Sequence, residues 1–278
     1  MRTYILRVES PDEKGLVYRL TRVLFNHGLN MITNGEFVDR DRKRFYMRAE
    51  VEGECDVEKV ADELRSDLPA EATIELGDAR KKNTVVLATK ESHCLGDLLI
   101  RHAADEFNAN ILAVISNRKV LGDLVERFDI PFHCISHRGL DREEHEAQVL
   151  DVIGTYEFDH LVLAKYMRIL SSDFVRKFPG QMVNIHHSFL PAFIGANPYR
   201  QAFDRGVKII GATAHLVTND LDEGPIIAQN VIPVDHTHSA ADMAQAGRDV
   251  EKAVLAKALK LVFEERVFIS GNRTVIFD

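Results

Sequence analysis

The chain has 278 residues, of which 45% are hydrophobic and 28% charged, as is typical of a soluble globular protein. Its formal net charge of -8 argues against a nucleic-acid-binding protein, because surfaces that contact phosphates are usually basic. The sequence has no apolar run of the roughly 20 residues that a membrane helix needs, and its N-terminus lacks the apolar core of a signal peptide. Three cysteines without a Cys-x-x-Cys pair suit a reducing compartment. We therefore expect a cytoplasmic protein that contacts neither nucleic acid nor membrane.

The first 80 residues predict six elements in the order strand, helix, strand, strand, helix, strand. Strands are predicted at 3–8, 31–38, 45–51 and 72–76, with helices starting near Leu16 and Val57. This βαββαβ order is the ferredoxin-like arrangement. The polar stretch 77–83 is the best candidate for a linker, so we predict a first domain at 1–80.

The rhythm changes after the linker to alternating strands and helices. Apolar, β-rich runs predict strands at 84–89, 110–115, 160–164, 182–185 and 209–217. Helical spacing predicts helices near 95–106, 121–128, 143–156, 172–178 and 240–265, and a final hairpin at 267–277. Such alternation predicts a second α/β domain at 84–278, with a mostly parallel, doubly wound sheet covered by helices on both faces. Sites in these sheets open at the carboxyl ends of the strands.

The strand at 182–185 runs into the most informative motif of the chain. Because side chains alternate along a strand, Asn184 and His186 point to the same side, at the end where a site is expected. An amide beside an imidazole can polarise a carbonyl and move a proton. Taken alone, the pair could equally be two core polar residues satisfied by neighbouring backbone.

A second stretch places further polar residues near a strand end. The strand at 209–217 puts Thr213, His215 and Val217 on one face and runs into an acidic turn that contains Asp222 and closes with Gly-Pro. Such a turn by itself is most often a solvated loop. Its combination with the Asn-x-His strand is more specific.

Three motifs in this order resemble the enzymes that transfer formyl groups from 10-formyltetrahydrofolate. They are Asn-Ile-His-x-Ser-x-Leu-Pro, Gly-Ala-Thr-x-His-x-Val and Leu-Asp-x-Gly-Pro, and the resemblance covers residues 84–278. It implies that Asn184, His186 and Asp222 are the catalytic triad. In the first domain, Asp12-x-x-Gly15-Leu-Val resembles the loop-to-helix turn of an ACT domain. An ACT domain ahead of a formyltransferase-like domain resembles the arrangement of the formyltetrahydrofolate deformylases.

Three details favour a hydrolase over a transferase. His187 stands where the transferases typically carry proline, and the loop 193–199 resembles that of the deformylases. The segment 90–97 lacks the glycine-rich loop with which a transformylase cradles a substrate phosphate through close backbone contact. Water is then the expected acceptor of the formyl group.

The resemblance implies hydrolysis of 10-formyltetrahydrofolate to tetrahydrofolate and formate, which supplies formate and recycles free folate for one-carbon and purine metabolism. Asn184 and protonated His186 would donate hydrogen bonds to the formyl oxygen. Asp222 would orient His186, accept protons from the attacking water, or both. No metal or other cofactor is expected. The pairs His133/His137 and His236/His238 have spacings compatible with metal binding, but neither comes with a recognised metal motif.

Substrate contacts are expected from two loops and a few flanking residues. The stretch after the strand at 160–164 resembles the family's pterin-binding loop, and the turn after the strand at 209–217 would form the opposite wall. The candidate binding residues are Tyr166, Met167, Arg168, Ile169, Leu170, Val217, Thr218 and Asn219. His187, His215 and Gly195 would contact substrate or support the site. Without the resemblance, the apolar members of the first loop could be plain core.

The ACT-like domain predicts regulation or oligomerisation, with a dimer or tetramer expected. A small amino-acid effector would bind near Asp12 and Gly15, with Asn30 or Asn34 as contacts across an interface. A purely structural role in holding the oligomer is the alternative. Two other functions also stay open: a transferase with an amine acceptor, and an amino-acid-sensing regulator in which the second domain is a degenerate enzyme.

Overall fold

The computed structural model describes residues 2–192 and 197–278, which divide into two compact units. Unit 1 comprises Met1–Arg80, Glu265–Phe268 and Val275–Asp278, and unit 2 comprises Lys81–Glu264 and Ile269–Thr274. The predicted second domain, 84–278, thus contains two short C-terminal segments that cluster with unit 1. Among the described residues, no helix is long and apolar enough to span a membrane.

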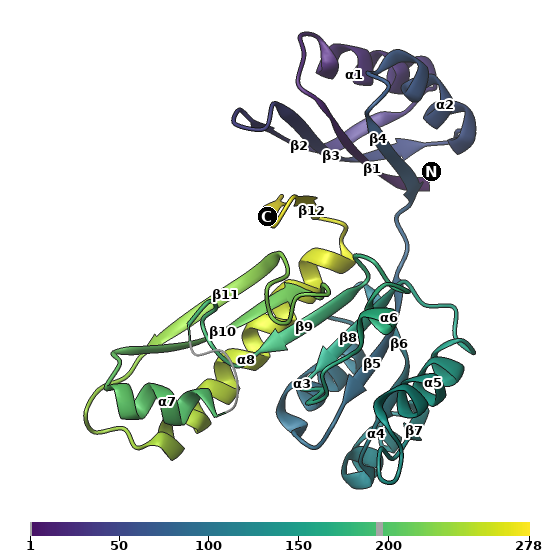
Figure 1. Cartoon of the computed structure of the whole chain (residues 1–278). Helices are drawn as coiled ribbons and strands as arrows, with labels where there is room; N and C mark the ends of the chain where they lie inside the picture. Colours follow the sequence, from purple (N-terminus) through teal and green to yellow (C-terminus); the bar gives the residue numbers. More distant parts are fainter. Residues whose placement is uncertain (1, 193–196) are drawn as a thin grey trace. The chain divides into compact units, whose positions relative to one another are not determined.

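Unit 1 has the predicted order of strands and helices. Its elements are β1 (Arg2–Pro11), α1 (Leu16–Asn26), β2 (Asn30–Asp39), β3 (Arg44–Gly53), α2 (Val57–Asp67) and β4 (Thr73–Asp78). The strands form an antiparallel sheet in the order β2-β3-β1-β4. Both helices cover one face of this sheet (Figure 1). Leu6 and Val8 of β1 pack there with Leu20 of α1 and Leu64 of α2. The alternating apolar residues of the strand and the apolar faces of the two helices thus form one core.

The C-terminal residues contribute aromatic contacts to unit 1. The Phe268 ring lies 5.7 Å from the Tyr46 ring and 5.6 Å from the Phe277 ring, measured between centroids. The Arg7 guanidinium lies 4.5 Å from the centroid of Phe268 and donates a hydrogen bond to the Val267 carbonyl. These contacts explain why the last residues cluster with unit 1 although they follow unit 2 in sequence.

Unit 2 is built on a seven-stranded sheet in the order β11-β10-β9-β8-β5-β6-β7. Its strands are β5 (Lys82–Ala88), β6 (Ala109–Ser116), β7 (Phe132–Cys134), β8 (His160–Ala164), β9 (Met182–His186), β10 (Ile209–Leu216) and β11 (Ile226–Pro233). The five strands from β9 to β7 are parallel, whereas β10 is antiparallel to both of its neighbours. The mostly parallel α/β sheet that the sequence predicts is confirmed, and the antiparallel edge is an addition to it.

Helices cover both faces of this sheet (Figure 1). They are α3 (Ser92–Ala103), α4 (Gly122–Glu126), α5 (Arg142–Ile153), α6 (Ser172–Val175), α7 (Pro198–Arg205) and α8 (Ala240–Phe263), with a 3₁₀ turn at Lys119–Leu121. After α8 the chain forms a C-terminal hairpin of β12 (Val267–Ser270) and β13 (Arg273–Ile276). Alternation along β5 explains the two layers. Val85 and Leu87 pack with Val149 of α5, whereas Val86 faces Leu98 of α3.

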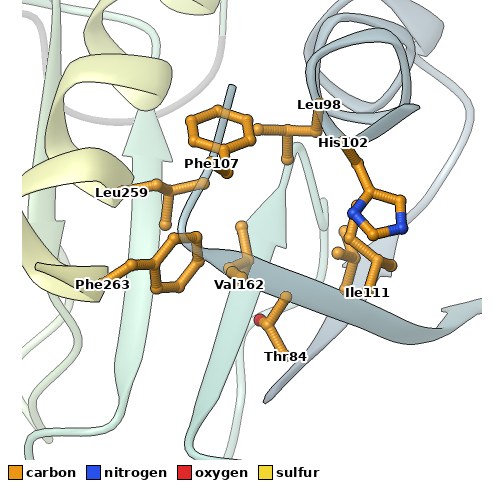
Figure 2. A pocket seen from close by; sticks show the side chains of 10 residues that line it. Thr84, Leu98, His102, Phe107, Ile111, Val162, Leu259 and Phe263 are labelled. Atoms are coloured by element: carbon orange, nitrogen blue, oxygen red, sulfur yellow. The ribbon is translucent and has the colours of Figure 1, made fainter. Parts of the chain in front are cut away.

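The layer formed by α3 and α8 encloses a small apolar cavity (Figure 2). Leu98 and Phe107 approach Leu259 and Phe263 of α8 there, above Val162 of β8. The cavity has a volume of about 10 Å³, which is the size of one water molecule at most. It is therefore a packing defect of the core and not a ligand site.

Candidate active site

The pairing of β9 with β10 assembles the polar residues that the sequence singles out. Asn184 lies directly opposite His215, and His186 lies opposite Thr213. Cross-strand partners on one face have Cβ atoms only about 5 Å apart. A β-bulge between Ala214 and His215 shifts the register towards β11 at this point, a feature common beside active sites.

His215 fixes the orientation of the Asn184 amide. The His215 Nδ1 lies 2.9 Å from the Leu216 carbonyl oxygen and must donate to it, because a carbonyl only accepts. The His215 Nε2 lies 3.1 Å from Asn184 Nδ2 and so accepts from it. Only 2% of the His215 side chain is exposed. One N–H of the Asn184 amide is thereby committed to His215, and its other N–H is left for another partner.

Asp222 joins this pair from the turn after β10. Its Oδ2 lies 3.2 Å from His186 Nδ1, and its Oδ1 lies 3.6 Å from His215 Nε2. The turn returns tightly against β10, since Leu216 N donates to the Pro225 carbonyl. A Cβ at Gly224 would lie 1.8 Å from the Leu216 oxygen, so only glycine fits there. The Gly-Pro end of the motif thus positions the carboxylate.

The pKa of Asp222 and the burial of His186 together indicate a polar binding site. Burial alone would raise the pKa of Asp222, but its hydrogen bond with His186 holds that pKa well below its usual range. The other ring nitrogen of His186, Nε2, is buried and has no hydrogen-bond partner among the residues that the structure describes. Unsatisfied buried polar atoms are rare in native proteins, so this nitrogen is the natural contact for a substrate.

His187 lies beside His186 and not on the opposite side of the strand. The sequence places it opposite only if the strand continues, but β9 ends at His186. The two imidazole rings stack with centroids 5.1 Å apart and an interplanar angle of 23°. Burial, together with the nearby Lys165 cation, lowers the pKa of His187 to about 4, so this ring is neutral at neutral pH.

Thr213 anchors the loop that follows β9, a role that the sequence does not reveal. Its hydroxyl donates to the Ser188 carbonyl at 2.9 Å and accepts from Leu190 N at 3.0 Å. Gln229 Nε2 of β11 donates to both Thr213 Oγ1 and the Leu190 carbonyl. The Ser-x-Leu part of the first motif therefore contributes backbone groups that hold the loop, and with it His187, against β10.

The two predicted substrate loops both begin where a strand ends. Tyr166, Leu170 and Val217 pack in the core cluster on the α5 face of the sheet. Met167 and Ile169 are more than half exposed. The Met167 N–H donates to Thr89 Oγ1 after β5, so this loop is tied to the neighbouring strand. Thr218 and Asn219 lie in the turn that leads to Asp222, whereas Gly195 is outside the described residues.

A further polar cluster lies after β6, and the sequence analysis does not anticipate it. Asn117 is 4% exposed, and its Nδ2 lies 3.2 Å from His137 Nδ1. Its Oδ1 has no hydrogen-bond partner in residues 2–192 and 197–278. Burial and the positive charges of Arg168 and Arg118 lower the pKa of His137. Two arginines and an unsatisfied amide thus meet next to the predicted pterin loop. They come from segments about 50 residues apart, which no local pattern connects.

The residues expected near an effector lie in unit 1. Asp12 and Gly15 line a cavity of about 350 Å³ together with Leu16, Glu36 and Phe45. Asn30 and Asn34 are exposed on the edge strand β2 and do not line this cavity. The Asn30 amide donates to Glu52 of β3.

The histidine pairs with metal-like spacing have other partners. His133 Nε2 lies 2.7 Å from the Tyr156 hydroxyl, and His238 Nδ1 lies 2.9 Å from Asp235. Within residues 2–192 and 197–278, one group of donors is compact enough to hold a metal, namely His93, Cys94 and Glu251. The sequence analysis assigns no role to these three residues.

Comparison with known proteins identifies the family. The sequence profile of the formyl transferase family matches residues 82–259. The chain is 54% identical over 272 residues to the formyltetrahydrofolate deformylase of Escherichia coli O6:H1 (strain CFT073), covering 98% of this chain and 97% of that protein. The chain belongs to the formyltetrahydrofolate deformylase family. A crystal structure of a deformylase from Pseudomonas syringae pv. tomato agrees with a TM-score of 0.96 at 40% identity, covering 100% of this chain and 95% of that one.

The deformylases also differ from a related transferase in how much of this chain they match. Glycinamide ribonucleotide transformylase 1 from Symbiobacterium toebii has a TM-score of 0.69 at 29% identity, covering 74% of this chain and 98% of its own. The deformylase matches extend over nearly the whole chain and so include unit 1.

Proposed function

We propose that this chain hydrolyses 10-formyltetrahydrofolate to tetrahydrofolate and formate, the reaction that its family's name describes. The similarity to deformylases over nearly the whole chain, which a transformylase matches over 74%, carries the choice of a hydrolase. The products are free folate and formate, which feed one-carbon and purine metabolism. Three free thiols fit action in the reducing cytoplasm.

Catalysis in this proposal rests on two donors aimed at the formyl oxygen. Water attacks the formyl carbon, the bond to N10 breaks, and one proton of the water ends on N10. The charge that builds on the oxygen is stabilised by the free N–H of Asn184 and by Nε2–H of protonated His186. Such preorganised donors are worth about 3 kcal/mol each in a water-poor site. The buried and unpartnered His186 Nε2 is the observation that supports this role.

Asp222 acts in this mechanism mainly by holding His186. It accepts from His186 Nδ1 at 3.2 Å, which turns Nε2 towards the substrate. Because its hydrogen bond with His186 keeps its pKa well below the usual range, the carboxylate is a weak proton acceptor in the resting enzyme. Of the two roles that the sequence leaves open, orientation of the histidine is therefore favoured over deprotonation of water.

The folate would bind along the carboxyl edge of the sheet. We assign the pterin ring to the backbone of the loop from Tyr166 to Leu170, with Val217, Thr218 and Asn219 as the opposite wall. The substrate's glutamate tail is anionic, and Arg168 and Arg118 next to Asn117 supply complementary charge. Arginine suits this task because its planar guanidinium matches a carboxylate.

Unit 1 is proposed to be an ACT-like domain with the ferredoxin-like fold. Its cavity beside Asp12 and Gly15 is the place for a small amino-acid effector. Edge strand β2 exposes Ile32 and Phe37 to 49% and 47%, and an unpaired apolar edge of this kind suits contact with a second copy in a dimer or tetramer. The effector role is tested by formate release with and without added amino acids, comparing the native chain with Asp12→Ala.

The function itself is tested by incubating the chain with 10-formyltetrahydrofolate in buffer alone and measuring formate and tetrahydrofolate. The native chain should release both in equal amounts. Asp222→Asn should lower release by about 10²-fold or more, because the carboxylate no longer fixes His186. Glu223→Gln, an exposed neighbour in the same turn, is the matched control. If the native chain released formate only when an amine was added, a transferase would be favoured. Equal formate release by the native chain and Asp222→Asn would refute the role of Asp222.

A further inference from the structure

A second buried charged cluster lies at the carboxyl edge of the sheet in unit 2. Its centre is Glu251 of α8, which is 1% exposed. The Glu251 Oε2 lies 2.7 Å from His93 Nε2 and 3.1 Å from Lys165 Nζ, and its Oε1 accepts from the Tyr199 hydroxyl at 2.6 Å. We call His93, Lys165, Tyr199 and Glu251 the Glu251 cluster.

The cluster combines several features that packing alone would not favour. An ion pair this deeply buried loses its hydration, and apolar residues of similar volume would often be at least as stable. Lys165 is 7% exposed and adopts the left-handed backbone conformation, which is strained for a residue other than glycine. A Cβ at Gly247 would lie 2.1 Å from the Tyr199 oxygen, so a glycine at this position of α8 leaves the space that the tyrosine side chain occupies.

A metal site does not account for the cluster. The donors of His93, Cys94 and Glu251 lie within 4.8 Å of one another. However, the Lys165 ammonium already occupies the side of Glu251 where an ion would bind. Burial and the Glu251 charge raise the pKa of the Cys94 thiol, which keeps it protonated and a poor metal ligand.

The cluster adjoins the candidate active site through His187. The His187 ring stacks on His186, and its centroid lies 6.4 Å from that of Tyr199. The charges of Lys165 and Glu251 both act on this ring. The cluster therefore forms the surroundings of the imidazole next to the proposed donor to the formyl oxygen.

This position matters for the choice of acceptor. In hydrolysis, the oxygen of water forms the new bond to the formyl carbon. In transfer, an amine nitrogen forms that bond and the proton it loses ends on N10. An amine needs more space than water and a hydrogen-bond acceptor for its N–H groups. Both oxygens of Glu251 already contact donors of the cluster, and the neighbouring Lys165 cation is unfavourable for an amine that arrives in its protonated form.

We propose that the Lys165–Glu251 pair, held by His93 and Tyr199, is the specificity determinant that leaves water as the acceptor of the formyl group. This inference rests on the proposed hydrolysis of 10-formyltetrahydrofolate. Lys165 and Glu251 act by excluding an amine and not by touching the reacting atoms. Removal of the pair should thus change where the formyl group goes, and not only how fast it leaves folate.

The experiment measures the partition of the formyl group between water and a probe amine. The full-length chain is incubated with 10-formyltetrahydrofolate and excess glycinamide, and formate and N-formylglycinamide are quantified. The native chain should yield formate with only a trace of N-formylglycinamide. Lys165→Met removes the ammonium but keeps most of the stem, and it should raise the formylated fraction of product by about tenfold or more. Lys165→Arg keeps the cation and should restore formate as the product.

The control is Lys252→Met, which lies next to Glu251 on α8 but pairs with Asp249 on the surface. It should leave the partition unchanged. If Lys165→Met does not fold, Tyr199→Phe removes only the hydroxyl that holds Glu251 and should shift the partition in the same direction. Formate release by the native chain with an unchanged partition in the folded variants would overturn this inference alone. Absence of formate release by the native chain would overturn the proposed function and this inference with it.

Discussion

Two carboxylates at the same edge of the unit 2 sheet, the half-buried Asp222 and the buried Glu251, both lie among polar side chains but differ in whether a polar atom is left without a partner. Asp222 contacts His186 and His215, whereas Glu251 contacts His93, Lys165 and Tyr199. In each case burial raises the pKa of the carboxyl group, and the polar partners outweigh burial and lower it. Within the described part of the chain, the Asp222 cluster leaves His186 Nε2 buried without a partner, whereas both oxygens of Glu251 contact donors.

This difference shows that a depressed carboxyl pKa does not by itself identify the reacting group. Structural ion pairs shift pKa values as strongly as catalytic ones do. The unsatisfied nitrogen separates the cluster that we propose meets substrate from the one that we propose only shapes the space beside it.

The largest effect is expected for His186→Gln. The variant loses the imidazole donor to the formyl oxygen, so formate release should fall by about 10³-fold. Folate binding, measured by titration of tetrahydrofolate, should change little because the histidine contacts only the reacting group. A loss of less than tenfold would place the donor elsewhere and remove the proposed difference between the two clusters.

The main effect expected for Glu251→Leu is a lower free energy of unfolding. Removing one member of a buried ion pair leaves the other charge uncompensated, which typically costs about 3 kcal/mol. Urea unfolding of the native and variant chains measures this change. The double variant Glu251→Leu with Lys165→Met should recover part of the loss, since no buried charge is then left unpaired. A double variant that is less stable than the sum of the single changes would contradict this account.

His215→Phe should have a smaller effect on catalysis. The ring volume is kept, but the acceptor that orients the Asn184 amide is lost. We expect about tenfold lower kcat, equivalent to roughly one hydrogen bond, with KM for folate nearly unchanged. His215→Gln, which retains an acceptor, should recover some of this activity. Equal rates for the native chain and His215→Phe would show that Asn184 needs no such support.

The smallest effect is the pH dependence that His187 contributes to stability. Its pKa is about 4 in the folded chain against an ordinary value of 6.5, so between these values the unfolded chain binds a proton that the folded chain does not. Stability should therefore fall with falling pH in this window, by about 1.4 kcal/mol per pH unit at most. His187→Phe should lack this component when the free energy of unfolding is compared at pH 7 and pH 5. If the free energy of unfolding changed equally between pH 7 and pH 5 in the native chain and in His187→Phe, His187 would be solvated in the folded chain.

Much of the fold and part of the site could be predicted from the sequence. The alternation along β9 places Asn184 and His186 on one side, and this depends only on the period of two in a strand. The βαβ rhythm predicts a parallel sheet with its site at the carboxyl ends of the strands. Three elements of unit 2 were not predicted, namely β7, α7 and β11, because short segments carry a weak periodic signal. The antiparallel direction of β10 was also not predicted, because apolar alternation does not reveal strand direction.

The sequence by itself determined the order of elements in unit 1, the Asn-x-His pair and the Gly-Pro turn that carries Asp222, because each depends on neighbouring residues. Only the tertiary structure decided the pairing of Asn184 with His215, the stacking of His187 on His186 and the Glu251 cluster. His93 and Glu251 are 158 positions apart and meet only because α3 and α8 cover the same face of the sheet. Contacts of this kind leave no periodicity in the chain, since they depend on packing between elements and not on the conformation of any one of them.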